Sequence, residues 1–391
     1  MAAPSKKEHK IERLVNAPEK LSRRGLFVFA SIFAVIGTII LIKSFAAPNP
    51  NQPGDLNGDN TVNINDLSIL LTNYGTSSTT ADINGDGTVN VLDLSILLSH
   101  YGQTYTGGGG TSSTIPNNLG VMGQAAPSWT DSTKWRTDSA SLISQLQGVN
   151  TNGSDITTSY GPAFYTAKST DPTITVTNTN GWGTIPGTAS FKLPAGARPA
   201  SGGDAHLAVV QPDGSMYELW KAAGSGNSWT AGAISKASAG QYYYTIAGCR
   251  GSSLTLPSGV VSPEEVKAGA INHVLAATLP SGAVSKSYVF PSYISDGVIT
   301  TGIPEGARLV LDPSYDTSSY TGLSKIVAQT LKTYGMMIVD KGGSDIGILA
   351  EASESWTSIG QPDPWAAQGI SDYQNLNITP LLSHMKIAVS N

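Results

Sequence analysis

The stretches DLNGDNTVNIND, residues 55–66, and DINGDGTVNVLD, residues 82–93, are one 12-residue pattern written twice, with starts 27 residues apart. Both copies carry an oxygen-bearing side chain at positions 1, 3, 5, 9 and 12. Both also have a threonine at position 7, where a calcium loop uses a backbone carbonyl. A hard cation that takes about six to eight oxygen ligands needs this density of donors. The repeat therefore predicts two calcium-binding loops, with two bound ions.

The two loops differ at position 6, which calls for a sharp turn with positive φ. Gly87 adopts that conformation without strain, and Asn60 is the next most tolerant residue type. The first loop is therefore the slightly poorer copy. The expected ligands of the two loops are Asp55, Asn57, Asp59, Thr61, Asn63 and Asp66, and Asp82, Asn84, Asp86, Thr88, Asn90 and Asp93.

Each loop is followed by a second repeated segment, LSILLTNYG at 67–75 and LSILLSHYG at 94–102. In the first copy, apolar side chains recur at helical spacing as Leu67, Leu70, Leu71 and Tyr74, and the second copy repeats them. A glycine at the end of each copy is a typical helix stop. The runs before the loops, one proline-rich and one threonine-rich, disfavour a preceding helix. Each loop is thus expected to have an exit helix only.

A loop followed by one helix, duplicated, with Val62 and Val89 at loop position 8, resembles the type I dockerin module over about residues 53–102. The resemblance implies calcium-dependent folding and docking onto a cohesin domain, commonly in polysaccharide-degrading systems. Position 12 is aspartate in both copies, where the helix–loop–helix calcium site has a bidentate glutamate. The alternative is a calcium-stapled spacer without a protein partner, because metal alone can justify the ligands in so small a module.

The N-terminal region has the features of a membrane anchor. Residues 1–24 form a basic tail, and residues 25–42 are apolar without a charge, long enough at about 1.5 Å per residue to span roughly 27 Å of bilayer. The prediction is a transmembrane helix or signal anchor at 25–43, with the basic side cytoplasmic and the C-terminal part at the cell surface. The alternative is a signal peptide cleaved near the small residues of SFAAP, 44–48, which would leave a secreted protein.

Composition narrows the possibilities further. A net charge of −5 argues against a nucleic-acid partner. Cys249 is the only cysteine, so no intrachain disulfide can form and stability must come from a core and from metal. Residues 103–115 read as a Gly/Ser/Thr linker.

Residues 116–391 are predicted to form a mainly β domain. Short runs rich in β-branched and aromatic residues alternate with Gly, Pro, Ser and Asp, which favours a β-sandwich or jelly roll. Two short helices are expected, one opening with the capping box of Ser262 and Glu265 and one with an apolar face from Leu323 to Tyr334. The stretches DGSMYELWKA, INHVLAATLP, IPEGARLVLDPS and LKTYGMMIVDKGG resemble secreted bacterial β-sandwich proteins of unassigned activity.

No catalytic motif such as HExxH or GxSxG occurs in the chain, so candidate chemistry rests on strand faces. Alternate side chains of a strand point to the same face, which places Asp204 with His206 on one strand and Glu218 with Trp220 on the next. The turn QPDGS joins the two strands. The three titratable residues are predicted as an acid/base set and Trp220 as a platform for a sugar ring. That reading favours a glycoside hydrolase or polysaccharide lyase acting on a polysaccharide.

The alternative is that these residues have only structural roles, with Trp220 in the core, Glu218 at the solvent edge and His206 hydrogen-bonded. The domain would then be a non-catalytic glycan-binding module or a structural surface domain. Asp340 and Glu351 are further carboxylates at strand ends.

Overall fold

The computed structural model describes residues 53–56, 62–78, 80–103 and 120–389. The predicted basic tail and membrane segment, and nearly all of the predicted linker, lie outside these ranges and stay predictions. Among the helices of the described part of the chain, none is long and apolar enough to cross a bilayer. Two parts are described separately below: the repeat module of residues 53–103 and the C-terminal domain of residues 120–389.

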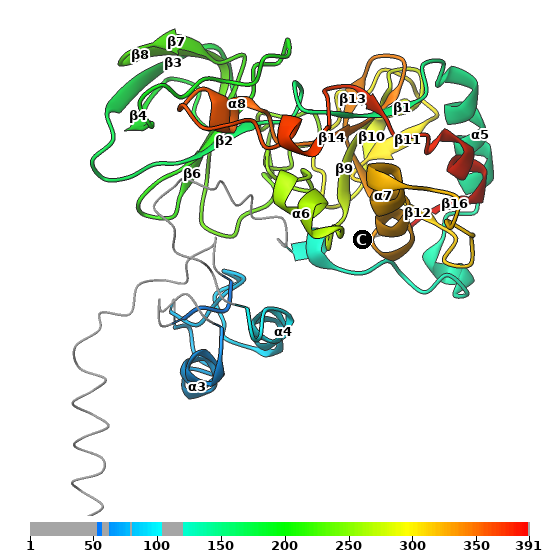
Figure 1. Cartoon of the computed structure of the whole chain (residues 1–391), viewed down its shortest axis with the longest axis horizontal. Helices are drawn as coiled ribbons and strands as arrows, with labels where there is room; N and C mark the ends of the chain where they lie inside the picture. Colours follow the sequence, from blue (N-terminus) through cyan, green and yellow to red (C-terminus); the bar gives the residue numbers. More distant parts are fainter. Residues whose placement is uncertain (1–52, 57–61, 79, 104–119, 390–391) are drawn as a thin grey trace, which may run out of the picture. The chain divides into compact units, whose positions relative to one another are not determined.

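The repeat module contains the two exit helices predicted from the sequence, α3 (Ile64–Thr72) and α4 (Val91–Ser99) (Figure 1). Asn63 and Asn90 cap their N-termini, and Asp66 and Asp93 complete a capping box in each. The helices end before Gly75 and Gly102, which have φ of +79° and +84°.

Backbone hydrogen bonds join each loop to the end of the other repeat's helix. The Val89 N–H donates to the Thr76 carbonyl and the Gly75 N–H donates to the Val89 carbonyl, both at 2.8 Å. The first loop repeats the exchange: Val62 N–H donates to Gln103, and Gly102 N–H donates to Val62, again at 2.8 Å. This reciprocal pairing closes the module around a small core. The core consists of Leu56, Val62, Leu70, Ala81, Val89 and Leu97.

The C-terminal domain contains two mixed seven-stranded sheets. The first sheet has the order β15-β1-β14-β9-β13-β12-β16. Its strands are β15 (Gln374–Asn375), β1 (Ser154–Thr157), β14 (Ile346–Leu349), β9 (Leu275–Pro280), β13 (Met336–Gly342), β12 (Arg308–Leu311) and β16 (Met385–Ile387). The second sheet has the order β2-β5-β6-β8-β3-β4, with β7 (Ala223–Ser225) paired to β8. Its other strands are β2 (Ala163–Thr166), β5 (Leu207–Val210), β6 (Met216–Trp220), β8 (Ser228–Ala237), β3 (Thr173–Trp182) and β4 (Thr188–Lys192).

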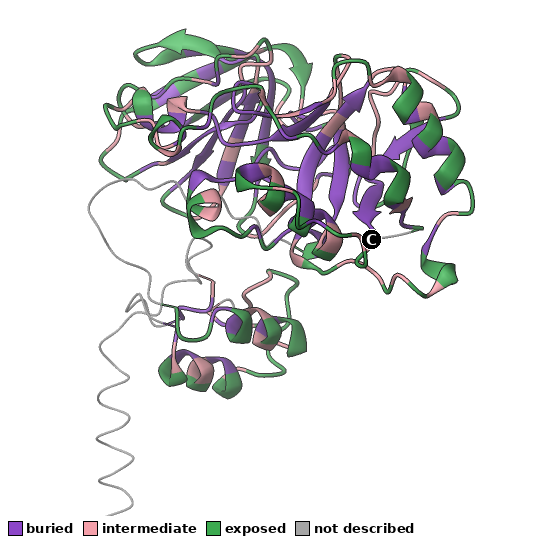
Figure 2. Ribbon diagram, turned by 45° about the vertical axis from the view of Figure 1, so that its right-hand side comes forward, coloured by how far each residue is buried: buried purple, intermediate pink, exposed green. Residues whose placement is uncertain are grey.

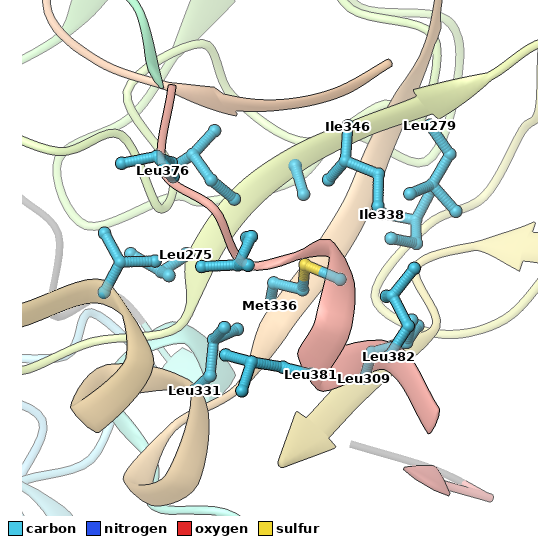
Figure 3. Close-up of a cluster of buried hydrophobic side chains, with 14 of the residues drawn as sticks. Leu275, Leu279, Leu309, Leu331, Met336, Ile338, Ile346, Leu376, Leu381 and Leu382 are labelled. Atoms are coloured by element: carbon cyan, nitrogen blue, oxygen red, sulfur yellow. The ribbon is translucent and has the colours of Figure 1, made fainter. Parts of the chain in front are cut away.

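Most side chains of the central strands of the first sheet are apolar and buried on both faces (Figure 2), except at the end of β13, where Asp340 and Lys341 are partly exposed. On one face, Leu275, Met336 and Ile338 pack with the helices α5 (Ser139–Val149) and α7 (Gly322–Thr333), in the cluster drawn in Figure 3. On the other face, Ala276 and Met337 share a core with residues of the second sheet. The remaining elements are a short parallel pair, β10 (Val284–Tyr288) with β11 (Ile303–Glu305), the helices α6 (Pro263–Ala268) and α8 (Glu354–Thr357), and the 3-10 turns η1 (Gly120–Gly123), η2 (Ser132–Lys134), η3 (Ala366–Gln368) and η4 (Thr379–His384).

The prediction of a mainly β domain is confirmed, as are the capping box of α6 and the apolar helix α7. The jelly-roll alternative was wrong, because β1 with β14, β9 with β13, β2 with β5 and β3 with β8 pair in parallel, whereas a jelly roll is antiparallel. Alternation identifies a strand but not its direction. The expectation of two helices was also too low: α5 and α8 were missed, since the serines and glycine of α5 favour loops in a local reading.

Candidate functional sites

The second calcium loop brings its predicted ligands together. The amide groups of Asn84 and Asn90 lie 2.9 and 3.1 Å from Asp86 Oδ2, and Asn90 Nδ2 lies 2.9 Å from the Thr88 carbonyl oxygen. Asp82 accepts hydrogen bonds from the Gly85 and Gly87 N–H groups, so its two oxygens span the turn. The hydrogen bond from Asn84 is the main cause that lowers the pKa of Asp86 below its ordinary value, and it keeps this carboxylate ionised.

The aspartate at position 12 is fully buried in both repeats and holds both ends of its loop. Asp93 accepts from the N–H groups of Ile83 at 2.7 Å and Asn90 at 2.7 Å. Asp66 makes the equivalent contacts with Leu56 and Asn63, each at 2.8 Å. As the third residue of its exit helix, each aspartate is placed so that its carboxylate reaches both ends of its loop.

The donor set of the second loop fits a calcium ion. It combines three carboxylates, two side-chain amides and a backbone carbonyl within one turn, which are the oxygen donors that calcium prefers. In the first loop Asp55, Asn63 and Asp66 are described, whereas Asn57, Asp59 and Thr61 lie outside the described residues. Binding at these twelve positions, and the number of ions, stay predictions.

The helices of the module expose matching apolar side chains. Leu71 and Leu98 are 54% and 52% exposed, and Tyr74 and Tyr101 are each 47% exposed. Ile64 and Val91 repeat the match at the helix starts. The apolar face predicted from Leu67, Leu70, Leu71 and Tyr74 is thus divided: Leu70 enters the core, Leu67 is half-buried, and the last two face solvent. Both helices thus leave a leucine and a tyrosine exposed at equivalent positions.

The C-terminal domain has a cavity of about 380 Å³ over one face of its first sheet. Four neighbouring strands contribute one cross-strand row, in which Asp155 pairs with Gly347, Gly347 with Thr278, and Thr278 with Asp340. Gly347 brings no side chain to this row, and a Cβ there would lie only 2.8 Å from Thr278 Oγ1. The cavity is lined by Asp155, Thr157, Tyr160, Asp204, His206, Arg250, Thr278, Asp340, Lys341, Gly342, Gly343, Asp345, Gly347, Leu349 and Tyr373.

Two carboxyl groups that line the cavity, Asp155 and Asp340, have a pKa raised to about 7, mainly by burial. Burial, a hydrogen bond with Asp345 and the charges of Asp345 and Asp372 raise the pKa of Asp155 to about 7. Two carboxylates in contact repel each other when both are ionised, which favours a proton on Asp155. Tyr160 and Tyr373, 38% and 53% exposed, connect this end of the cavity to solvent.

The structure brings only part of the predicted catalytic set together. Asp204 and His206 line the cavity, whereas Glu218 and Trp220 are not among its lining residues. The predicted hairpin is present, with Ala208 opposite Glu218, and Trp220 Nε1 donates to Asp204 Oδ1 at 2.9 Å. The cavity therefore does not support the catalytic role predicted for Glu218 or the platform role predicted for Trp220.

The surroundings of His206 and Trp220 explain their placement. The two ring nitrogens of His206 lie 3.1 Å from the Cys249 carbonyl oxygen and 3.3 Å from that of Tyr160, and burial lowers the pKa of His206. Because a neutral imidazole carries one N–H, His206 donates to one of these two carbonyl oxygens at a time. The ring of Trp220 stacks on Trp182 at 5.3 Å between centroids, so that the exposed ring there is Trp182, at 56%.

Glu218 is fully buried in the core between the sheets. Its carboxyl group accepts from the Leu256 N–H at 2.6 Å and contacts the Tyr244 hydroxyl at 3.0 Å. Burial raises the pKa of Glu218 to about 7, although these two hydrogen bonds act in the opposite direction. Alternation correctly placed Glu218 and Trp220 on one face, but that face is the inner one, and a glutamate there is held by the core rather than offered to a substrate.

We expect Glu218→Gln to stabilise the domain at alkaline pH. The raised pKa means that the wild type is fully stabilised below pH 4.5 and loses this contribution as pH rises through about 7. Glutamine stays neutral and fits the same two partners, so the variant should match the wild type at pH 5 and be more stable at pH 8.5 by about 2–3 kcal/mol. Chemical denaturation at both pH values measures this; a variant less stable than the wild type at pH 8.5 contradicts it.

The carboxylates that sequence reasoning missed are Asp155 and Asp345. Both occur in the same short pattern, SDI, at 154–156 and 344–346; Asp155 lies in β1, and Asp345 directly precedes β14. The pattern was the available signal, but only the parallel register of β1 with β14 shows that the two aspartates meet.

The comparisons with known proteins agree with the repeat module. The family model described as "Dockerin type I domain" matches residues 53–100, and type I dockerins bind calcium. A solved structure described as "Type II cohesin-dockerin domain from Bacteroides cellolosolvens" is 41% identical to this chain; the match covers 14% of this chain and 90% of that chain, with a TM-score of 0.14. No curated protein matches the chain. Residues 53–100 of this chain therefore form a dockerin module.

Proposed function

We propose that the protein is a cell-surface component that docks to a cohesin through its dockerin module, with two calcium ions holding the docking helices in place. The observation that carries this proposal is the exposure of matched leucine and tyrosine pairs on α3 and α4. A module with a core of six buried residues gains little by exposing such side chains unless a partner covers them. The predicted membrane segment would place the docking close to the cell's own surface.

Substitution of the exposed leucines tests the docking surface. In the full chain, Leu71→Asp combined with Leu98→Asp should weaken binding to a type I or type II cohesin by about 100-fold or more, because desolvated anchors dominate such interfaces. Titration calorimetry in calcium gives the affinities.

The matched control is Ser77→Asp, which adds charge at an exposed position outside both helices. It should bind as the wild type does, and circular dichroism should show the helices intact in every variant. If the double variant binds a cohesin as tightly as the wild type, these leucines are not the docking surface.

We further propose that the C-terminal domain acts on carbohydrate, as a polysaccharide-degrading enzyme. This second function is supported by the cavity, where Asp155 lies next to Asp345 and has a raised pKa, and where Asp204 adds a third carboxylate. A carboxyl group with a pKa near 7 can donate a proton to a leaving group at neutral pH. Release of reducing ends from a panel of polysaccharides is the assay. Glycan binding without release would indicate a binding module. If the domain neither binds nor cleaves a glycan, it is a structural domain.

A further inference from the structure

Three carboxyl groups of the C-terminal domain converge beside the cavity. Asp296 comes from the loop between β10 and β11, Glu305 ends β11, and Asp340 lies in β13, and one oxygen from each lies within 4.8 Å of the others. Asp340 also lines the cavity, so the cluster borders it. Three segments that are separate in sequence thus direct acidic side chains at one point.

Glu305 has no solvent exposure, and neither of its carboxylate oxygens accepts a hydrogen bond of regular geometry in the described structure, although Asp296 is an electrostatic neighbour through its side chain and its backbone. Oδ1 of Asp296 likewise accepts no hydrogen bond of regular geometry in the described structure. A buried carboxylate normally has strong hydrogen-bond or charge partners, because burying it without them is costly. Glu305 is therefore directed into a space where a partner for oxygen atoms is expected.

Gly251 forms the floor of this space. A Cβ at this residue would lie 2.8 Å from Asp340 Oδ1 and 2.9 Å from Asp296 Oδ1, so any side chain would fill the gap between the two carboxylates. Its backbone N–H donates to Asp340 Oδ2 at 3.3 Å, which leaves Oδ1 toward the gap. Glycine is required here for space, and the space lies between oxygen ligands.

The nearby cations only partly offset the three negative charges. Lys341 forms an ion pair with Asp296 Oδ2. The guanidinium of Arg250 is buried close by, but its hydrogen bonds go to the carbonyl oxygens of Thr255, Leu256 and Ser258.

We propose that Asp296, Glu305 and Asp340 form a binding site for one hard divalent cation, such as calcium, separate from the loops of the dockerin module. All three ligands are carboxylates, which suit calcium, magnesium or manganese rather than soft metals. The ion would balance the buried charge of Glu305 and join the loop that carries Asp296 to β13. The inference goes beyond the proposed function, since it stands whether the domain cleaves carbohydrate or not.

The competing arrangement has no ion and keeps a proton on Glu305. Burial and the neighbouring charges of Asp340 and Asp296 raise the pKa of Glu305 to about 11 in the absence of a cation, and the protonated group can then donate to Asp296. The two arrangements differ in the effect of Glu305→Gln. Glutamine imitates the protonated acid, so the variant should fold in either case, but it removes a charged ligand.

The test uses the full chain with Asp55→Ala and Asp82→Ala, which remove the first ligand of each dockerin loop. Equilibrium dialysis against calcium should show about one bound ion per chain, and addition of Glu305→Gln should abolish it. At about 100 times the dissociation constant, calcium should raise the unfolding midpoint of the C-terminal domain by roughly 5 °C in the parent and leave that of the Glu305→Gln chain unchanged.

Glu218→Gln is the matched control, because it is the same change at another fully buried glutamate and should keep both the ion and the thermal shift. Asp296→Asn, at a partly exposed residue, is a second variant that should also lose the ion. If the loop-deficient chain binds none of calcium, magnesium and manganese, or if Glu305→Gln binds as much as its parent, the proposal is overturned.

Discussion

Removal of calcium should unfold the dockerin module. In a fragment of residues 50–104, chelation should abolish the helical circular dichroism signal, and added calcium should restore it. The reason is that three carboxylates crowd the second loop, and a core of six residues is too small to offset their repulsion. The aspartates at position 12 couple this loss to the helices, since each one caps its helix and binds its loop.

Asp93→Ala gives the same prediction by substitution. It removes a helix cap and leaves three N–H groups without their acceptor, so the fragment should stay largely unfolded even with excess calcium. Ser77→Asp is again the control and should fold with calcium as the wild type does. If the chelator leaves the spectrum of the wild-type fragment unchanged, the assignment of the two loops as calcium sites is wrong.

Asp155→Asn should reduce polysaccharide cleavage by about 100- to 10,000-fold, the usual contribution of a positioned proton donor. Asparagine has the shape of the protonated acid, which the wild type holds up to pH 7 or so, and the fold should therefore be retained. In the wild type, kcat/KM should fall as pH rises above about 7, because Asp155 then loses the proton that it donates.

The controls for this experiment separate the cavity from the rest of the domain. Asp316→Asn, at a surface aspartate that only caps the Ser318 turn, should leave cleavage unchanged. Equal activity of Asp155→Asn and the wild type would remove Asp155 from the reaction, even if a polysaccharide is cleaved.

The dockerin module could be predicted because its determinants are local. In each copy the ligands, the asparagine cap and the stopping glycine all lie within one short segment, residues 55–75 or residues 82–102, and each feature occurs in both copies. What the sequence did not show is that Val62 and Val89 each pair with the end of the other repeat's helix, or that Leu71 and Leu98 face solvent. Both depend on how the two repeats pack.

The cavity could not be predicted, because its residues meet only through sheet register. Asp155 and Asp345 are 190 positions apart, and they become neighbours when β1 and β14 pair in parallel. Alternation gave the correct hairpin and the correct shared face for Glu218 and Trp220, but it does not say which face is covered. Here the segment carrying Tyr244 and Leu256 covers it, and Glu218 becomes a core residue.

Calcium-dependent docking of the dockerin module to a cohesin can be tested by a single binding measurement. The full chain is titrated against a panel of type I and type II cohesins, once with millimolar calcium and once with a chelator. We expect saturable binding to at least one cohesin in calcium and no binding in the chelator. Binding that is equally tight in the chelator, or no binding to any cohesin in calcium by a module shown to be folded, would contradict it.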